Sequence, residues 1–196
     1  MSFWKKIFGK KKVSQEDEKS RSPFMPKKKD PVEIVFAHNF TEKGGRFLFS
    51  ESYSDFNVFF RNILEENNWI KSDVFSLDIE ISKEFDLEIN TVPAIVKEKK
   101  VAFINCEFLI ANTGSVLISS NQIKDLNLNQ LPENIIVKAN TSQFARDVSE
   151  GMSKLKAFYS KNLPTNITTL NAKNSDKESD FLSQGNSSKH IYLLLQ

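Results

Sequence analysis

The most hydrophobic part of the chain, residues 101–118, constrains the fold more than any other segment. Two apolar, β-prone stretches there flank a short polar turn at residues 112–115. Strands that are apolar on both sides, without polar alternation, are typical of a sheet that is covered on both faces. The segment therefore predicts central strands of a sheet that is buried between other elements.

The segments on either side of this run predict alternating helices and strands. Apolar side chains recur at helical spacing over residues 53–67 and 142–161, and Pro164 would stop the second helix. Strands are predicted at residues 32–37, 46–49, 73–77, 134–139, 166–170 and 190–195, with a short helix or loop at 79–87. Strands separated by helices predict an α/β fold, specifically a three-layer α/β/α sandwich.

The N-terminal residues differ in composition from the rest. Residues 1–12, wound as a helix, would place four apolar side chains on one arc opposite lysines: Phe3, Trp4, Ile7 and Phe8. Such a basic amphipathic tip suits contact with a membrane surface, but a frayed tail is favoured because so short a helix is marginal in water. Residues 13–31 are charged and contain Ser and Pro, which predicts a flexible linker before one folded domain at 32–196.

Charge is distributed unevenly along the chain. Residues 1–29 hold ten basic and three acidic residues, a net +7, which leaves 17 basic and 22 acidic residues, a net −5, in the remainder. A phosphate backbone needs a basic face on the folded surface. We therefore predict no nucleic-acid partner.

The cysteine content and the N-terminus bear on the compartment. A single cysteine, Cys106, lies among apolar residues, which predicts a buried thiol and a reducing environment. Lys5 and Lys6 interrupt the apolar letters that a secretory signal would need, and no stretch has the roughly 18 apolar residues of a membrane span. The chain is predicted to be cytoplasmic, with membrane association only through residues 1–12.

The sequence matches none of the common catalytic and metal-binding motifs. Residues 42–45 lack the spacing of a phosphate-binding loop, no dinucleotide-binding glycine motif follows a strand, and residues 113–115 do not form a nucleophile elbow. One cysteine and two distant histidines, His38 and His190, give no metal-ligand spacing, so we predict no metal and no cofactor. His190 opens an apolar strand and is interpreted as structural.

The polar turn allows two interpretations. A glycine flanked by hydroxyl residues can direct backbone N–H groups toward a carboxylate or phosphate. An ordinary hairpin turn explains the same residues, because Asn and Gly tolerate a positive φ, and spacing alone favours this interpretation. The turn residues are Asn112, Thr113, Gly114 and Ser115.

The same turn carries a resemblance to a known family. Residues 111–118, together with the preceding residues 103–110, resemble the hallmark of the LUD (lactate utilisation domain) family, Ala-Asp-x-x-Ile-Ala-(Glu/Asp)-Thr-Gly-(Thr/Ser)-(Leu/Val)-Val-Leu. Residues 131–137 resemble its Leu-Pro-x-His-Ile-x-Val segment, and residues 191–195 are similar to its closing strand. The resemblance covers about residues 32–196 and implies a NagB/RpiA/CoA transferase-like fold.

The resemblance implies a role in oxidising lactate to pyruvate beside partner proteins that carry iron–sulfur clusters. It also implies ligand-binding positions at the turn and near the C-terminus, where Asp176, Glu178 and Gly185 stand for family residues. Asn112 replaces the family's acidic residue, and a family histidine and two prolines are missing. A cluster-free, non-catalytic or ligand-binding component is therefore expected. The alternative is an enzyme of the CoA transferase/isomerase-like superfamily that acts on a small carboxylate or phosphate compound, with Asp176 or Glu178 transferring a proton.

Overall fold

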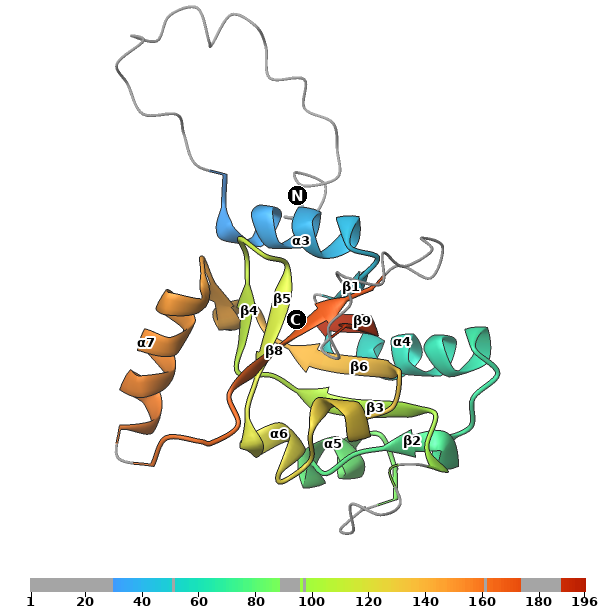
Figure 1. Ribbon diagram of the computed structural model, residues 1–196. Coiled ribbons are helices and arrows are strands. Elements are labelled where there is room, and N and C mark those ends of the chain that lie inside the picture. The colour runs from blue at the N-terminus through green and yellow to red at the C-terminus, as the bar shows by residue number, and fades with distance from the viewer. Residues whose placement is uncertain (1–29, 51, 89–95, 97, 161, 174–187) are drawn as a thin grey trace, which may run out of the picture.

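The computed structural model describes residues 30–50, 52–88, 96, 98–160, 162–173 and 188–196. These residues form a mixed nine-stranded sheet that is flanked by helices (Figure 1), so the predicted α/β class is confirmed. The strand order is β2-β3-β6-β9-β8-β5-β4-β7, with β1 also paired to β9. The predicted tip, and all of the predicted linker except residues 30 and 31, lie outside the described residues.

One half of the sheet is parallel. It contains β1 (Arg46–Phe49), β2 (Val74–Phe75), β3 (Val101–Asn105), β6 (Asn134–Ala139) and β9 (Ser188–Leu195). Helices α4 (Tyr53–Glu66) and α5 (Ile79–Glu84) cover its outer face, where Phe60, Phe85 and Phe103 pack with ring centroids 4.7–5.4 Å apart. Aromatic pairs at such separations add packing energy beyond the area they bury.

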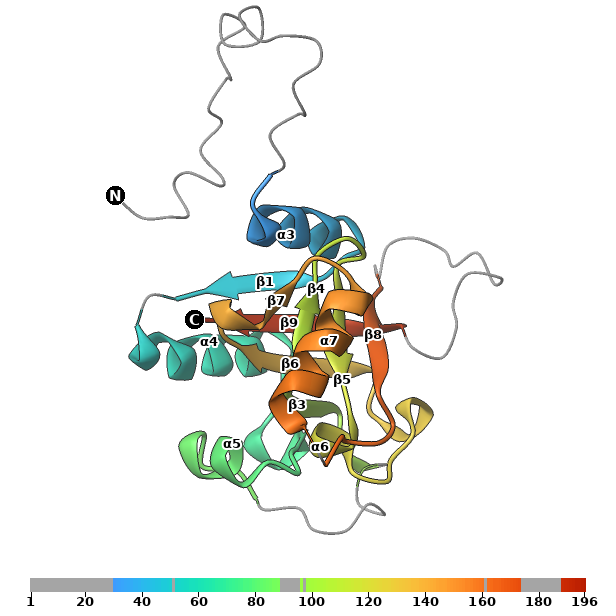
Figure 2. The same cartoon turned by 90° about the vertical axis from the view of Figure 1, so that its left-hand side faces the viewer.

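The other half is mixed and folds over the inner face of the first. It contains β4 (Phe108–Ile110), β5 (Ser115–Ile118), β7 (Phe144–Ala145) and β8 (Thr168–Ala172). Helix α7 (Val148–Tyr159) covers its outer face through Leu155, which packs with Ile110 and Leu117 (Figure 2). Alternate residues of β4 and β5, such as Leu109 and Val116, point the other way, because side chains alternate along a strand.

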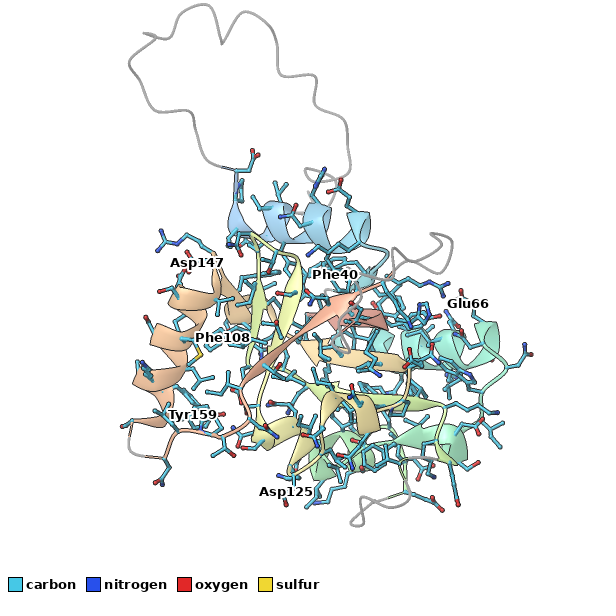
Figure 3. The ribbon with its side chains drawn as sticks, in the orientation of Figure 1. Phe40, Glu66, Phe108, Asp125, Asp147 and Tyr159 are labelled. Atoms are coloured by element: carbon cyan, nitrogen blue, oxygen red, sulfur yellow. The ribbon has the colours of Figure 1, made fainter. Side chains whose placement is uncertain are left out.

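The largest core lies between the two halves. Alternate residues of β3, β6 and β9 face it, and helix α3 (Val32–Glu42) closes one end with Phe36. Phe40 of the same helix also faces this core (Figure 3). The ring of Phe36 stacks on Phe40 at 5.3 Å and meets the edge of Phe144 at 5.4 Å. Both faces of the central strands are therefore buried, as the apolar run predicted.

The remaining helices are short. Helix α6 (Ser120–Ile123) follows β5, and 3₁₀ turns lie at Lys71–Asp73, Leu128–Gln130 and Thr141–Gln143. Within the described residues, no helix is both long enough and apolar enough to cross a membrane.

The prediction of a strand at residues 32–37 is wrong, because these residues begin α3. Phe36, Ala37 and Phe40 are buried together at a spacing of one and three residues, which only a helix can place on one face. The carbonyl of Pro31 accepts hydrogen bonds from the next turn and starts the helix. A six-residue apolar stretch does not distinguish a strand from a buried helix.

The helix predicted at residues 142–161 begins six residues later, at Val148. Phe144 belongs instead to β7, which pairs with β4, although its spacing fits the helical pattern. The helix starts where the Asp147 side chain accepts a hydrogen bond from the N–H of Glu150.

The other predicted elements are present with small shifts. The predictions at residues 46–49 and 134–139 match β1 and β6, and residues 53–67 match α4 to within one residue. Strands predicted at 166–170 and 190–195 extend over Thr168–Ala172 and Ser188–Leu195. The elements predicted at 73–77 and 79–87 are shorter, as β2 and α5.

A buried carboxylate joins α6 and α7 to the sheet. Glu107 is 8% exposed, and its Oε1 accepts hydrogen bonds from the side chains of Ser119 at 2.6 Å and Asn121 at 2.9 Å. The hydroxyl of Tyr159, at the end of α7, donates to Glu107 Oε2 at 3.1 Å. Burial and the charge of Glu107 raise the pKa of Tyr159, so the hydroxyl stays protonated and able to donate.

We expect Tyr159→Phe to lower the free energy of unfolding by about 1–2 kcal/mol, because it removes a hydrogen bond to a charged, buried group. Urea unfolding followed by circular dichroism measures this loss. The matched control is Phe158→Leu on the neighbouring residue, which is 80% exposed and should change the value by less than about 0.5 kcal/mol. Equal losses in both variants would contradict the role of the hydroxyl.

Candidate functional site

The predicted turn at Asn112–Ser115 connects β4 to β5 and lies against helix α3. Gly114 has a φ of +59°, and a Cβ atom there would lie 2.4 Å from the backbone nitrogen of Phe40. Lys43 Nζ donates to the carbonyl of Thr113 at 2.6 Å. The glycine is therefore required both by its backbone angle and by the close approach of α3.

Several polar groups of this turn already have protein partners. The N–H of Asn112 donates to the carbonyl of Arg146 at 3.0 Å, and the N–H of Gly114 donates to Ala111 at 3.3 Å. The hydroxyls of Thr113 and Ser115 are 2.6 Å apart and share a hydrogen bond. These contacts show that the turn packs against helix α3. The binding of an anion by the turn stays a prediction.

The other predicted ligand-binding residues, Asp176, Glu178 and Gly185, lie outside the described residues. The described residues nearest to them in the sequence are Lys173 and Ser188. The N–H of Lys173 donates to the carbonyl of Lys189 at 2.9 Å, so the end of β8 lies beside the start of β9.

A cavity of about 200 Å³ lies where β9 changes its neighbour along one edge. The first two residues of β9, Ser188 and Lys189, pair with β8, whereas Tyr192–Leu195 pair with β1. His190 lies between these two pairings. We call this cavity the fork pocket, and its lining residues are Gly44, Arg46, Asn67, Asn134, Lys173, His190, Ile191 and Tyr192.

Two sets of contacts link the turn to the wall of the fork pocket. Lys43, which binds the turn, directly precedes Gly44 in the pocket wall. Ser115, the last turn residue, pairs with Asn171 on β8, two residues before Lys173. The turn therefore supports one wall of this pocket without lining it.

Two cationic side chains, Arg46 and Lys173, line the fork pocket, and Lys189 shares a carboxylate with Lys173. Arg46 Nη1 lies 2.8 Å from Oε1 of Glu66, which is at the end of α4 (Figure 3). The same nitrogen donates a hydrogen bond to the hydroxyl of Tyr192, and the guanidinium lies 4.9 Å from the centre of the Tyr192 ring. Lys173 Nζ lies 2.6 Å from Glu133 Oε2. Lys189 is 3% exposed, and its Nζ lies 3.1 Å from Glu133 Oε1.

The pKa values of Glu133 and His190 respond to these cations. Burial alone would raise the pKa of Glu133, but hydrogen bonds from Lys173 and Lys189 outweigh it, and the pKa is lowered. Burial, together with the charges of Lys173 and Arg46, lowers the pKa of His190 although Glu133 opposes this. His190 is therefore neutral at pH 7.

The fork pocket suits a small anion. The two lining cations and Lys189 pair with two carboxylates, Glu66 and Glu133, so among these described residues one positive charge is left over while His190 is neutral. Since a water occupies ~30 Å³ in the liquid, the volume corresponds to roughly six or seven water molecules. Hydrogen-bond donors on β1, β6, β8 and β9 line this space.

A second cavity, of about 330 Å³, lies at the carboxyl ends of β3 and β6. Ligands of open α/β sheets commonly bind at such ends. Here, however, the acidic Asp78, Glu80 and Glu84 line the cavity together with Lys138, and Lys138 is ion-paired with Glu84. These acids disfavour an anion, so we regard the fork pocket as the candidate site.

Cys106 lines the second cavity but does not offer a reactive thiol. It is 5% exposed, which confirms the predicted burial. Burial, and to a lesser extent the charge of Glu107, raise the pKa of Cys106 well above its ordinary value. A protonated thiol is a poor nucleophile.

The sequence did not identify the residues of the fork pocket. His190 lines the pocket, and its interpretation as structural stays a prediction. Arg46, Lys173 and Tyr192 belong to no catalytic or metal-binding motif that spacing alone would reveal. The other histidine, His38, lies on the exposed face of α3, 3.7 Å from Glu42. No group of three metal-binding side chains occurs within the part of the chain that the structure describes, and the predicted absence of a metal stays a prediction.

Comparison with known proteins identifies a family and a fold. The family model of the LUD domain matches residues 61–194. A solved DUF162 family protein from Deinococcus radiodurans superposes with a TM-score of 0.58 and 13% sequence identity, covering 84% of this chain and 95% of that chain. At this identity the likeness shows the fold alone. No curated protein matches the sequence significantly.

We expect Gly114→Ala to lower the free energy of unfolding by about 2 kcal/mol or more, because the new Cβ meets the α3 backbone at a positive φ. Thermal unfolding measures the loss. The matched control is Gly151→Ala in α7, where the nearest atom is a side-chain methyl at 3.1 Å and helix propensity favours alanine. A Gly114→Ala protein as stable as the Gly151→Ala protein would contradict the close approach of α3.

Proposed function

The chain belongs to the LUD-domain family, and from this premise we propose that it is a non-catalytic, ligand-binding component of a lactate-utilisation system. Its ligand is a small hydroxy- or ketocarboxylate of the lactate and pyruvate class. The ligand binds in the fork pocket. The observation that carries this proposal is the surplus of positive charge around a cavity of small volume.

The pocket residues match the two ends of such a ligand. A guanidinium binds a carboxylate with two parallel hydrogen bonds, so Arg46 is the proposed partner of the carboxylate. Lys173, which also lines the pocket, adds a second positive charge that neutralises it. The hydroxyl of Tyr192 and the amide of Asn67, which already bond to each other at 2.8 Å, lie beside Arg46. They are the proposed partners of the oxygen on the neighbouring carbon.

Oxidation of lactate to pyruvate releases two electrons and two protons, so the system needs an electron acceptor. Iron–sulfur clusters are held by four cysteine thiolates. The sequence contains one cysteine, and that residue is buried. We therefore propose that iron–sulfur partner proteins take the electrons, while this chain binds the carboxylate.

We expect the protein to bind lactate or pyruvate, and we expect Arg46→Gln to raise the dissociation constant at least tenfold. A charge-assisted hydrogen bond contributes about 1.5–3 kcal/mol, and a tenfold change corresponds to about 1.4 kcal/mol. Isothermal titration calorimetry with both acids measures the affinity.

The matched control is Arg146→Gln. Arg146 is also an exposed arginine paired with a glutamate, Glu150 at 2.7 Å, but it does not line the pocket. This variant should bind like the unaltered protein. If Arg46→Gln and Arg146→Gln bind equally well, the ligand lies elsewhere, and if the unaltered protein binds neither acid, the proposed ligand class is wrong.

We also expect the chain, when purified from its native cells under anaerobic conditions, to bring with it protein that contains iron and acid-labile sulfide. Metal analysis of the co-purified fraction, compared with a tag-only purification, measures this. An iron-free preparation at physiological expression would contradict the partner proposal without bearing on the ligand.

A further inference from the structure

His190 is surrounded by charged and polar groups from every element at the fork pocket. Arg46 lies on β1, Lys173 at the end of β8, Asn134 on β6, and Tyr192 two residues further along β9. Glu133 precedes β6 and contributes a negative charge, with Lys189 paired to it. Glu66 and Asn67, at the end of α4, contact Arg46 and Tyr192 respectively.

We propose that the fork pocket binds its anion together with a proton, and that His190 takes up this proton. The inference rests on the proposed function, because it concerns the ligand of the same pocket. Its consequence is that the pocket holds a carboxylate more tightly as the pH falls toward the range in which His190 titrates.

The surroundings of His190 disfavour a positive charge on its imidazole. The ring is partly buried, and the positive charges of Lys173 and Arg46 add to the cost of a further positive charge. Glu133 opposes this, but it is already shared between Lys173 and Lys189. The pKa of His190 therefore lies below its ordinary value in the absence of ligand.

A bound anion reverses this balance. A carboxylate between Arg46 and Lys173 offsets the two charges that repel a proton from His190, and it adds a negative charge to the same cavity. The pKa of His190 is then higher in the complex than in the free protein. Between these two pKa values the complex binds more protons than the free protein, so affinity rises as the pH falls.

The first experiment is calorimetric titration of the full chain with lactate at about pH 6.5, the ordinary pKa of histidine, in two buffers of different ionisation enthalpy. Proton uptake makes the measured heat depend on the buffer. We expect uptake of up to about one proton and an affinity that rises by no more than about tenfold for each pH unit between the two pKa values.

The matched variants are His190→Gln and His38→Gln, which alter the two histidines of the sequence. His38 is exposed and does not line the pocket, so its variant should retain proton uptake. His190→Gln should bind lactate with no dependence on the buffer. Proton uptake that persists in His190→Gln would overturn the proposal.

Proton NMR of the unaltered protein tests the same inference without relying on the fold of a variant. The imidazole signals of two histidines are assigned with His38→Gln, and we expect only the His190 titration to shift to higher pH when lactate is added. A His190 titration that lactate leaves unchanged, despite measured binding, would overturn the inference and leave the proposed function intact. Absence of lactate and pyruvate binding would instead defeat the proposed function.

Inorganic phosphate serves as a second probe of the pocket when the carboxylates fail. Because phosphate itself exchanges protons near neutral pH, uptake at His190 is measured as the difference between the unaltered protein and His190→Gln. Phosphate binding with such a difference would support the inference while contradicting the proposed ligand class. Phosphate binding with no difference, in a case where neither carboxylate binds, would contradict both.

Discussion

The hydrogen bonding of strand β9 is the constraint on which the rest of the structure depends. On one side β9 pairs along nearly its whole length with β6, which joins it to the parallel half. On its other side it pairs first with β8 and then with β1. A single strand thus links the two halves of the sheet and encloses the main core between them. The fork pocket lies at the point where β9 changes from one neighbour to the other.

The sequence predicted the parts of this fold that local pattern determines. Strands at residues 46–49 and 134–139 and the helix α4 could be read from apolar stretches and helical spacing. The errors arose where tertiary contacts decide. Residues 32–37 are helical because Phe36 and Phe40 pack beneath one face of α3, and Phe144 leaves the helical pattern to pair with β4. The residues that they contact are far away in the sequence: Phe36 meets Phe144, and Phe144 pairs with Leu109 of β4.

The candidate site was not predictable for the same reason. Arg46 lies on β1, Lys173 directly follows β8 and His190 lies on β9, so these side chains come together only where the three strands meet. The one motif that stood out, the turn at Asn112–Ser115, has a clear structural use in receiving α3. The resemblance that it carries points to the family that the family model matches, whereas the residues that line the pocket lie outside the turn.

The positions of the pocket residues along the sequence determine when the pocket can form during synthesis. Arg46 and Tyr192, which contact each other in the pocket wall, are 146 residues apart, so nearly the whole chain must be synthesised before they can meet. Pairings of such long range form late, because the entropy of closing the intervening chain must be overcome first. An incomplete chain therefore cannot form the fork pocket, and binding of the proposed ligand would distinguish a finished domain from any partly folded form.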